Sequence, residues 1–324
     1  MATAEQLKSL IKAHFSDNDE KFYTISLQIA AHESKLGHGA LAHEIREILD
    51  KQKLNRKAIL IAVPQDLQGL ILTEEPEESK ASLTINQTLR TRIDRIIQEF
   101  YQQNKLKSFG LKHRRKILLA GAPGTGKTMT AKVLAHELRL PLHIIQLDRV
   151  VTKFMGETSA KLRQIFDMIQ RDNGIYFFDE FDAIGGERSS ENDVGEMRRV
   201  LNAFLQFIEQ DKSDSLILAA TNNPHLLDNA LFRRFDDILY YELPEEIERK
   251  KLIKNILGTF ISEKLNWEEI LNTSKGLSQA EIDHASRDAI KNAILSNAKK
   301  IDIEIFIQML KERHNIYSRR DSQI

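Results

Sequence analysis

Five short β-rich segments alternate with helical patterns in the middle of the chain, and this alternation constrains the fold more than any other feature. Strands that are separated by helices need crossover connections, which are right-handed and give a mainly parallel sheet. The sequence therefore predicts an α/β domain with a parallel five-stranded sheet. The five segments are KILLA (116–120), LHIIQL (142–147), IYFFD (175–179), LILAAT (216–221) and ILYYEL (238–243).

The segments on either side of this domain have a different texture. The first part has apolar residues at helical spacing, followed by a short apolar run at 58–63 that favours a buried strand. The acidic stretch TEEPEESK (73–80) is typical of an exposed linker. Past Pro244 the strand pattern ends and helical spacing returns. We expect a mostly helical N-terminal domain with its acidic linker over 1–80, the α/β domain over 81–244 and a small all-helical domain over 245–324.

Composition excludes several classes of function. The 324 residues include 47 Lys and Arg against 47 Asp and Glu, so the net charge of zero gives no whole-chain attraction to nucleic acid or to an anionic membrane. The absence of cysteine excludes disulfides, thiolate nucleophiles and Cys-type zinc sites, and it fits a reducing compartment. No apolar run approaches the roughly 20 residues that span a bilayer, and the first residues lack a signal-peptide pattern. We expect a cytoplasmic protein that does not contact membranes.

The segment GAPGTGKT follows the first predicted strand and satisfies the pattern G-x-x-x-x-G-K-[ST]. Its glycines let backbone N–H groups surround phosphate oxygens, and the helix that follows adds its positive end. Lys127 can reach the β- and γ-phosphates, while the Thr128 hydroxyl can hold Mg²⁺. The alternative is a glycine-rich turn without a ligand. The expected nucleotide-binding residues are Gly121, Ala122, Pro123, Gly124, Thr125, Gly126, Lys127, Thr128 and Met129.

Two carboxylates follow the apolar segment at 175–178. A buried parallel strand places Asp179 at the carboxyl edge of the sheet, beside the phosphate loop. We expect Asp179 to bind Mg²⁺ and Glu180 to polarise the attacking water as a general base. An Asp-Glu pair alone also suits a solvated strand end.

Together these segments resemble the AAA subgroup of the AAA+ ATPases, which includes the FtsH and katanin types. The resemblance covers about Leu83 to Arg313 and implies Mg²⁺-dependent ATP hydrolysis, a helical lid after the sheet domain, and a homo-oligomeric ring of six subunits. The segments that carry it are GLKHRRKILLAGAPGTGKT (110–128), YFFDEFDAIGGER (176–188), LILAATNNPHLLDNALFRRFD (216–236) and GLSQAEIDHASRDAI (276–290).

The resemblance gives roles to residues outside the phosphate loop. It implies that Asn222 orients the lytic water or touches the γ-phosphate, although Asn222 could also cap the turn before Pro224. It implies that Arg233 and Arg234 are arginine fingers for the next subunit's nucleotide, and leaves open which of the two is primary. A guanidinium is a fixed donor fork suited to phosphoryl charge.

The lid motif at 276–290 carries no obvious sensor-2 arginine. We expect Ala280, a small residue, to let the lid approach the adenine closely, with Leu277 as a wall for the base. Tight helix packing is the alternative for both residues.

A segment between the second and third predicted strands resembles the pore loop of protein-translocating relatives. Lys153, Phe154, Met155 and Gly156 form an aromatic-hydrophobic-glycine sequence, and an aromatic side chain can grip an extended polypeptide with little sequence preference. The alternative is that Phe154 is a core residue. The polar segment SSENDVG (189–195) is a weaker candidate for a second loop of the same channel.

Three classes of partner remain open at this stage. A protein substrate that is remodelled, unfolded or threaded is our first expectation. The basic segment at 105–116 offers limited support for a nucleic-acid motor, which we consider unlikely because the segment is short and poor in aromatic residues. The third class is an ATP-driven adaptor of a partner protein, such as a subtilisin-like protease, since the chain resembles bacterial AAA proteins associated with such proteases.

Overall fold

The computed structural model describes residues 8–12, 19–39, 41–47, 63–153, 157–185, 191–227, 229–261 and 265–321. The chain forms two compact units, Met1–Pro64 and Gln65–Ile324. In the first unit, helix α2 (Asp19–Lys35) buries Ile25 and Ile29 against a few apolar neighbours. The strand that we expect at 58–63 lies, apart from Val63, outside the described residues.

The second unit contains a six-stranded sheet with the order β1-β3-β4-β5-β2-β6. All five predicted strands are present and pair in parallel. The prediction of five strands was incomplete, because β1 adds a sixth strand, antiparallel to β3 at the edge. Its four residues begin just before the acidic stretch and are too few to give a clear alternation. The strands are β1 (Ile71–Glu74), β2 (Lys116–Gly121), β3 (Leu142–Gln146), β4 (Ile175–Asp179), β5 (Leu216–Thr221) and β6 (Asp237–Tyr241).

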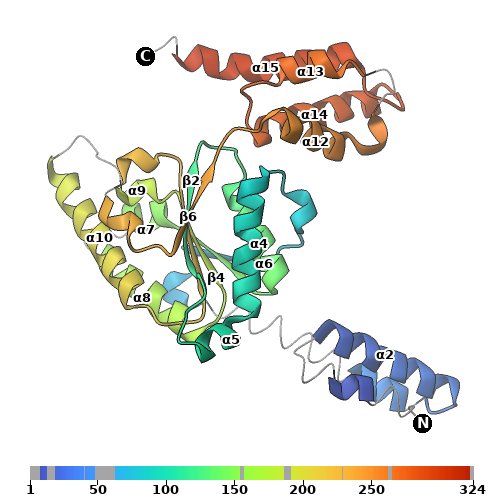
Figure 1. Cartoon of the computed structure of the whole chain (residues 1–324), viewed down its shortest axis with the longest axis vertical. Helices are drawn as coiled ribbons and strands as arrows, with labels where there is room; N and C mark the ends of the chain where they lie inside the picture. The colour runs from blue at the N-terminus through green and yellow to red at the C-terminus, as the bar shows by residue number, and fades with distance from the viewer. Residues whose placement is uncertain are drawn as a thin grey trace. The chain divides into compact units, whose positions relative to one another are not determined.

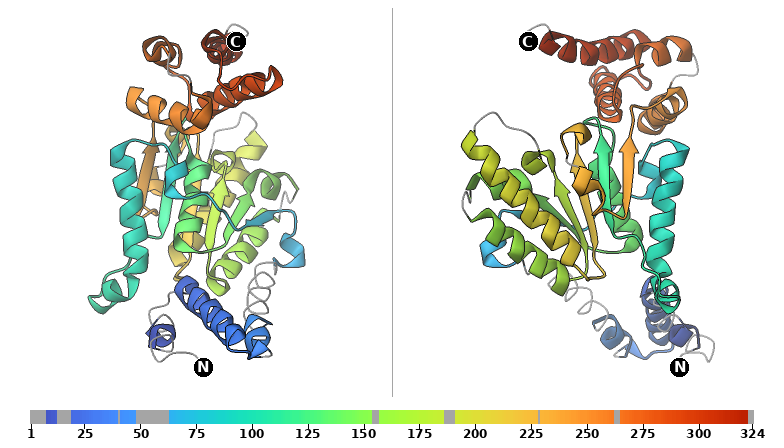
Figure 2. Two further views of the ribbon diagram at one scale, coloured as in Figure 1. Left: turned by 90° about the vertical axis from the view of Figure 1, so that its right-hand side faces the viewer. Right: turned by 60° about the vertical axis from the view of Figure 1, so that its left-hand side comes forward.

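Helices cover both faces of the sheet (Figure 1). Helices α4 and α6 pack on one face, and Figure 2 shows α8 and α10 on the other. The central strands are apolar throughout because both of their faces are buried, as for Phe177 and Phe178. These helices and their neighbours are α4 (Gln87–Tyr101), α5 (Gln103–Ser108), α6 (Lys127–Leu138), α7 (Leu147–Lys153), α8 (Thr158–Arg171), α9 (Asp182–Gly185), α10 (Glu191–Gln210) and α11 (Asn229–Phe232), with 3-10 turns at Gln65–Leu67, Lys80–Ser82 and Pro224–Leu226.

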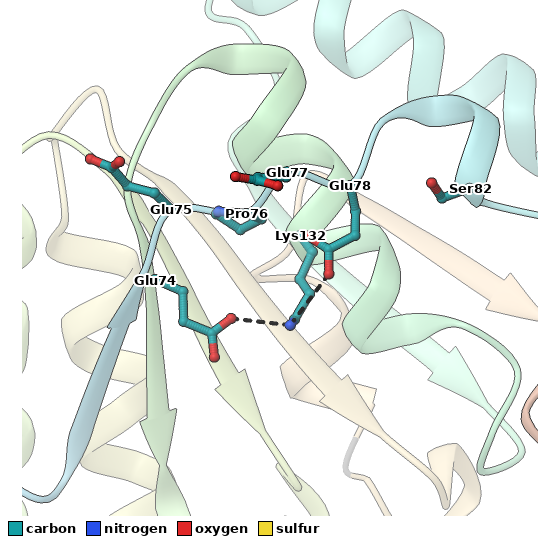
Figure 3. A pocket seen from close by; sticks show the side chains of 7 residues that line it. All are labelled: Glu74, Glu75, Pro76, Glu77, Glu78, Ser82 and Lys132. Atoms are coloured by element: carbon teal, nitrogen blue, oxygen red, sulfur yellow. Dashed lines mark ion pairs between the residues drawn. The ribbon is translucent and has the colours of Figure 1, made fainter.

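The acidic stretch after β1 is held against the sheet domain. Figure 3 shows a surface hollow in which Lys132 of α6 pairs with Glu74 at 3.1 Å and with Glu78 at 3.6 Å. The hydrogen bond and charge of Glu74 raise the pKa of Lys132. The backbone N–H of Lys80 donates to Glu137 of the same helix at 3.0 Å. Residues that composition alone placed in an exposed linker therefore include an edge strand and a segment fixed to α6.

The chain beyond Pro244 is helical, as its apolar spacing predicts. Its core contains Ile253, Ile270, Ile282 and Phe306, all fully buried. The third of the helices named below, α14, begins with a capping box between Ser278 and Glu281, which fixes its first turn. The helices are α12 (Glu246–Leu257), α13 (Trp267–Thr273), α14 (Gln279–Leu295) and α15 (Ile303–Asp321), with a 3-10 turn at Gly258–Phe260.

None of the helices in the described part of the chain combines the length and apolar character that crossing a membrane requires.

The basic segment before β2 is largely paired within the fold. Arg115 forms a buried ion pair with Asp211, which follows α10, and its guanidinium also donates to the Asp211 carbonyl at 2.5 Å. Arg114 pairs with Glu99, and the Lys116 ammonium donates to the carbonyl of Ile208. These cations join α4, β2 and the end of α10, so they are not presented as a surface for nucleic acid.

We predict that Asp211→Ala destabilises the second unit by ~3–5 kcal/mol, because the substitution leaves the Arg115 charge buried without its partner. The measurement is the free energy of unfolding from urea denaturation. Asp214→Ala is the matched control, since Asp214 pairs with Lys107 at an exposed site and its loss should cost no more than ~1 kcal/mol. Equal effects of the two substitutions would contradict the prediction.

Candidate active site

The phosphate loop connects β2 to α6 and depends on its glycines. Gly124 has φ +74° and Gly126 has φ +102°, a region that other residues rarely adopt. A Cβ on Gly124 would also lie 2.7 Å from the Ser278 hydroxyl of the lid. The loop can therefore turn its backbone N–H groups towards one point, just before the positive end of α6.

Lys127 is folded back across this loop. Its ammonium donates to the carbonyls of Gly121 at 2.7 Å and Ala122 at 2.8 Å, and the residue is buried. Burial lowers the pKa of Lys127 to about 8, although the charges of Asp179 and Asp182 oppose the shift. A buried cation whose hydrogen bonds go to carbonyls, with no ion pair among the described residues, is suited to receive an anion. The loop thus fits the phosphate groups of a nucleotide.

Asp179 ends β4 beside the first turn of α6. The Thr128 hydroxyl donates to one oxygen of the Asp179 carboxylate at 3.4 Å, and the Glu180 backbone N–H donates to the other at 2.9 Å. Partial burial raises the pKa of Asp179. Proteins usually hold Mg²⁺ through one or two carboxylates together with substrate phosphates and water. Thr128 and Asp179 fit that donor set, and no group of three or more His, Cys, Asp or Glu forms a preassembled metal site in the described residues.

Glu180 is exposed next to this edge and has φ +50°. A positive φ in a non-glycine residue is strained, and such residues cluster at functional sites. Partial desolvation and the charges of Asp148, Asp179 and Asp182 raise the pKa of the Glu180 carboxyl. A raised pKa makes a carboxylate a better proton acceptor for water.

Asp182 joins the loops that follow β4 and β5, and the sequence analysis missed it. Its carboxylate accepts the backbone N–H of Asn222 at 3.3 Å and approaches the amide of Asn223 at 3.5 Å. The backbone N–H of Phe181 also donates to the carbonyl of Ala220 at 2.8 Å. Asn222 is thereby placed at the same sheet edge as Asp179 and Glu180. The available signal was a third carboxylate two residues after Glu180.

The lid contacts the phosphate loop directly. The Ala280 backbone N–H donates to the Gly124 carbonyl at 3.0 Å. Leu277 differs from its expected role as a wall for the base, because its side chain is 1% exposed and packs in the core of the lid. Helix packing, the alternative for Leu277, is what the structure shows.

The two arginines of the FRRF segment have different environments. Arg234 forms an ion pair with Glu209 of α10 at 3.1 Å. Arg233 is exposed and has no hydrogen bond or ion pair among the described residues. The sequence does not distinguish these two neighbours, since the partner of Arg234, Glu209, lies 25 residues away in the chain. Within one chain, neither arginine contacts the phosphate loop or the carboxylates at its edge, as far as the described residues show.

The expected pore loop is largely outside the described residues. Phe154, Met155 and Gly156 are not described, and Lys153 is the last residue of α7. The expected second loop at 189–195 needs a correction, because Glu191 begins helix α10 and the residues from there on are helical.

Comparisons with known proteins agree with this arrangement. The family model for the ATPase family associated with various cellular activities (AAA) matches residues 117–243. An uncharacterized AAA family ATPase of Sinorhizobium fredii, y4kL, is 31% identical over 96% of both chains. The meiotic spindle formation protein mei-1 of Caenorhabditis elegans is 34% identical over 61% of this chain and 42% of its own length. The ATP-dependent zinc metalloprotease FtsH 1 of Methylacidiphilum infernorum is 31% identical over 65% and 34%, respectively.

The lowered pKa of Lys127 predicts a pH dependence of triphosphate binding. Below pH about 8 the lysine is already charged and affinity should be constant. Above it, binding must first restore a proton, so the affinity should fall about tenfold per pH unit. The measurement is the Kd of a non-hydrolysable ATP analogue between pH about 7 and 10.

Lys127→Arg is the control, because a guanidinium stays charged over this range and should remove the slope. Lys127→Ala should bind weakly at every pH. A flat profile for the natural protein up to pH about 10 would contradict the assignment of Lys127 to the phosphates.

Proposed function

Because this chain belongs to the AAA family of ATPases and hydrolyses ATP, we propose that it does so with Mg²⁺ at the seam between subunits of a ring, as a hexamer, and uses the energy to remodel or thread protein substrates. The observation that carries the proposal is a contrast of charge: the sheet edge at the phosphate loop is acidic, whereas Arg233 is an exposed cation without a partner among the described residues of its own chain. Four acidic side chains, Asp148, Asp179, Glu180 and Asp182, act on one another there, and Lys127 is the cation that acts on Asp179.

Phosphoryl transfer spreads negative charge over the γ-phosphate oxygens in the transition state. Besides the backbone N–H groups of the loop, Lys127 is the cation that acts on this acidic edge, so a further cationic donor would stabilise such charge. Arg233 is a charged, exposed donor without a partner among the described residues of its own chain. These facts support a site that a neighbouring subunit completes.

Each residue of the site then has one task. The loop at 121–126 and Lys127 bind the phosphates, while Thr128 and Asp179 would hold the magnesium ion, which supplies charge neutralisation on the phosphate oxygens when bound. Glu180 accepts a proton from the attacking water. Asn222, fixed through its backbone by Asp182, orients that water.

The contact between lid and loop supplies a route from chemistry to motion. The Ala280 N–H bonds the carbonyl of Gly124, so a shift of the loop on hydrolysis acts on the first turn of α14. The capping box and the apolar core make that helix move with the rest of the lid. Lid rotation is therefore our proposed power stroke.

A protein is the proposed substrate for two reasons. In the basic segment at 105–116, Arg114, Arg115 and Lys116 make contacts within the fold, which weakens the case for a nucleic-acid motor. One relative is by name an ATP-dependent metalloprotease, an enzyme that acts on proteins. In this proposal Phe154, between α7 and α8, grips the polypeptide.

We predict that Arg233→Ala lowers kcat for ATP by about 10³-fold, the lower end of the usual effect of an arginine finger, with little change in the Kd for ATP. Arg234→Ala is the matched control and should lower kcat much less, because Arg234 is committed to Glu209 in its own chain. Mixing Arg233→Ala with Glu180→Gln should restore part of the activity, since some seams then combine an intact base with an intact arginine.

An equal fall in kcat for Arg233→Ala and Arg234→Ala would contradict the assignment of Arg233 as the arginine that acts on the neighbour's nucleotide. A mixture that remains as inactive as its components would contradict completion of the site by a neighbour. Full activity of a monomer, measured by sedimentation at the assay concentration, would also overturn the proposal.

We predict that Phe154→Ala loses ATP-dependent unfolding of a tagged model protein while it still binds ATP with unchanged Kd. Phe109→Ala is the control, because Phe109 is an exposed aromatic residue, 75% accessible, that follows α5 and is not part of the proposed pore loop. The readouts are loss of substrate fluorescence and stimulation of hydrolysis by protein. Stimulation by DNA in place of protein, or unfolding by Phe154→Ala at the normal rate, would contradict threading.

A further inference from the structure

A small cavity lies beside the phosphate loop, where the lid meets the sheet domain. It is lined from the start of α4 by Ile85 and Asn86, from the loop by Thr125, and from the lid side by Pro244, Glu248 and Gln279. Four separate segments of the chain converge there. The cavity borders Thr125 of the phosphate loop, and its volume of about 20 Å³ admits a group the size of an amino group rather than a whole ring.

Two residues that line this cavity carry buried oxygens without a hydrogen-bond partner. They are Oε2 of Glu248 on α12 and Oε1 of Gln279 at the first turn of α14. Among the described residues, few side-chain oxygens are in this state. A buried acceptor that stays unpaired is costly. Two of them at one cavity indicate a ligand that brings donors.

The chemistry of the two acceptors selects the donor. A carboxylate accepts hydrogen bonds and cannot donate, whereas a glutamine amide can turn to present either its oxygen or its NH₂ group. An amino group on a planar ring has two N–H bonds, which equals the number of unpaired oxygens. A ring carbonyl at the same place would face the Glu248 carboxylate, and because both groups are acceptors no hydrogen bond could form between them.

We propose that Glu248 and Gln279 recognise the 6-amino group of the adenine ring and set the preference of this site for adenine over 6-oxo purine nucleotides. The inference rests on the proposed function, in that a nucleotide triphosphate occupies the phosphate loop. In this proposal Glu248 and Gln279, rather than Leu277, determine which base the site prefers. Because both residues belong to the lid, recognition of the correct base also holds the lid near the loop.

The test compares two ligands that differ at this one position of the purine. The full chain is titrated with the β,γ-imido analogues of ATP and of inosine triphosphate, and with inorganic tripolyphosphate, which has no base. We expect the natural protein to bind the ATP analogue more than about tenfold tighter than the inosine analogue. Glu248→Gln should lower that ratio by about tenfold, because an amide can turn and donate to the 6-oxo group.

Gln279→Ala should weaken binding of the ATP analogue about tenfold and leave tripolyphosphate binding unchanged. Glu246→Gln is the matched control, since Glu246 is exposed on the same helix and does not line the cavity. Its ratio should equal that of the natural protein. Thermal unfolding of each variant checks that the fold is retained.

The outcomes separate the two levels of the proposal. An unchanged ratio in both Glu248→Gln and Gln279→Ala, with ATP binding that still depends on Lys127, overturns base recognition and leaves the proposed function standing. A natural protein that binds both analogues equally also overturns base recognition. Failure of the natural protein to bind any of the three ligands overturns the proposed function itself.

Discussion

The parallel register of the central strands is the constraint on which the rest of this protein depends. Strands β4, β5 and β2 pair in parallel, so their carboxyl ends lie at one edge of the sheet. The phosphate loop leaves β2 there, Asp179 ends β4 there and Asn222 follows β5 there. Residues about 50 to 100 positions apart in the chain meet because backbone hydrogen bonds fix the strand ends together.

The electrostatics of that edge follow from its burial. Lys127 loses solvation and is left with carbonyl partners, while the carboxylates around Glu180 repel one another and raise its pKa. Such an edge is poised to receive a polyanion together with cations. The fold supplies the anion-binding backbone and one lysine, and it leaves Arg233 exposed on the surface. In the proposed mechanism a second copy supplies the last positive charge, which would couple catalysis to assembly.

The lid adds a second layer of control. It touches the loop through one backbone hydrogen bond at Gly124, and it borders the small cavity through Glu248 and Gln279. The lid helices would thus respond both to the phosphates, through the loop, and to the base. Because that group has its own apolar core, we expect it to move as one unit when the nucleotide changes.

The sequence by itself determined the five parallel strands, the phosphate loop and the position of Asp179 beside that loop, because each depends on local periodicity or on strand ends that must coincide. Only the tertiary structure decided the features that depend on distant partners. These are the edge strand β1, the tie from Asp182 to Asn222, the commitment of Arg234 to Glu209 and the burial of Leu277. Spacing along the chain shows which face of an element is apolar, but packing between elements decides which polar group finds a partner and which remains free.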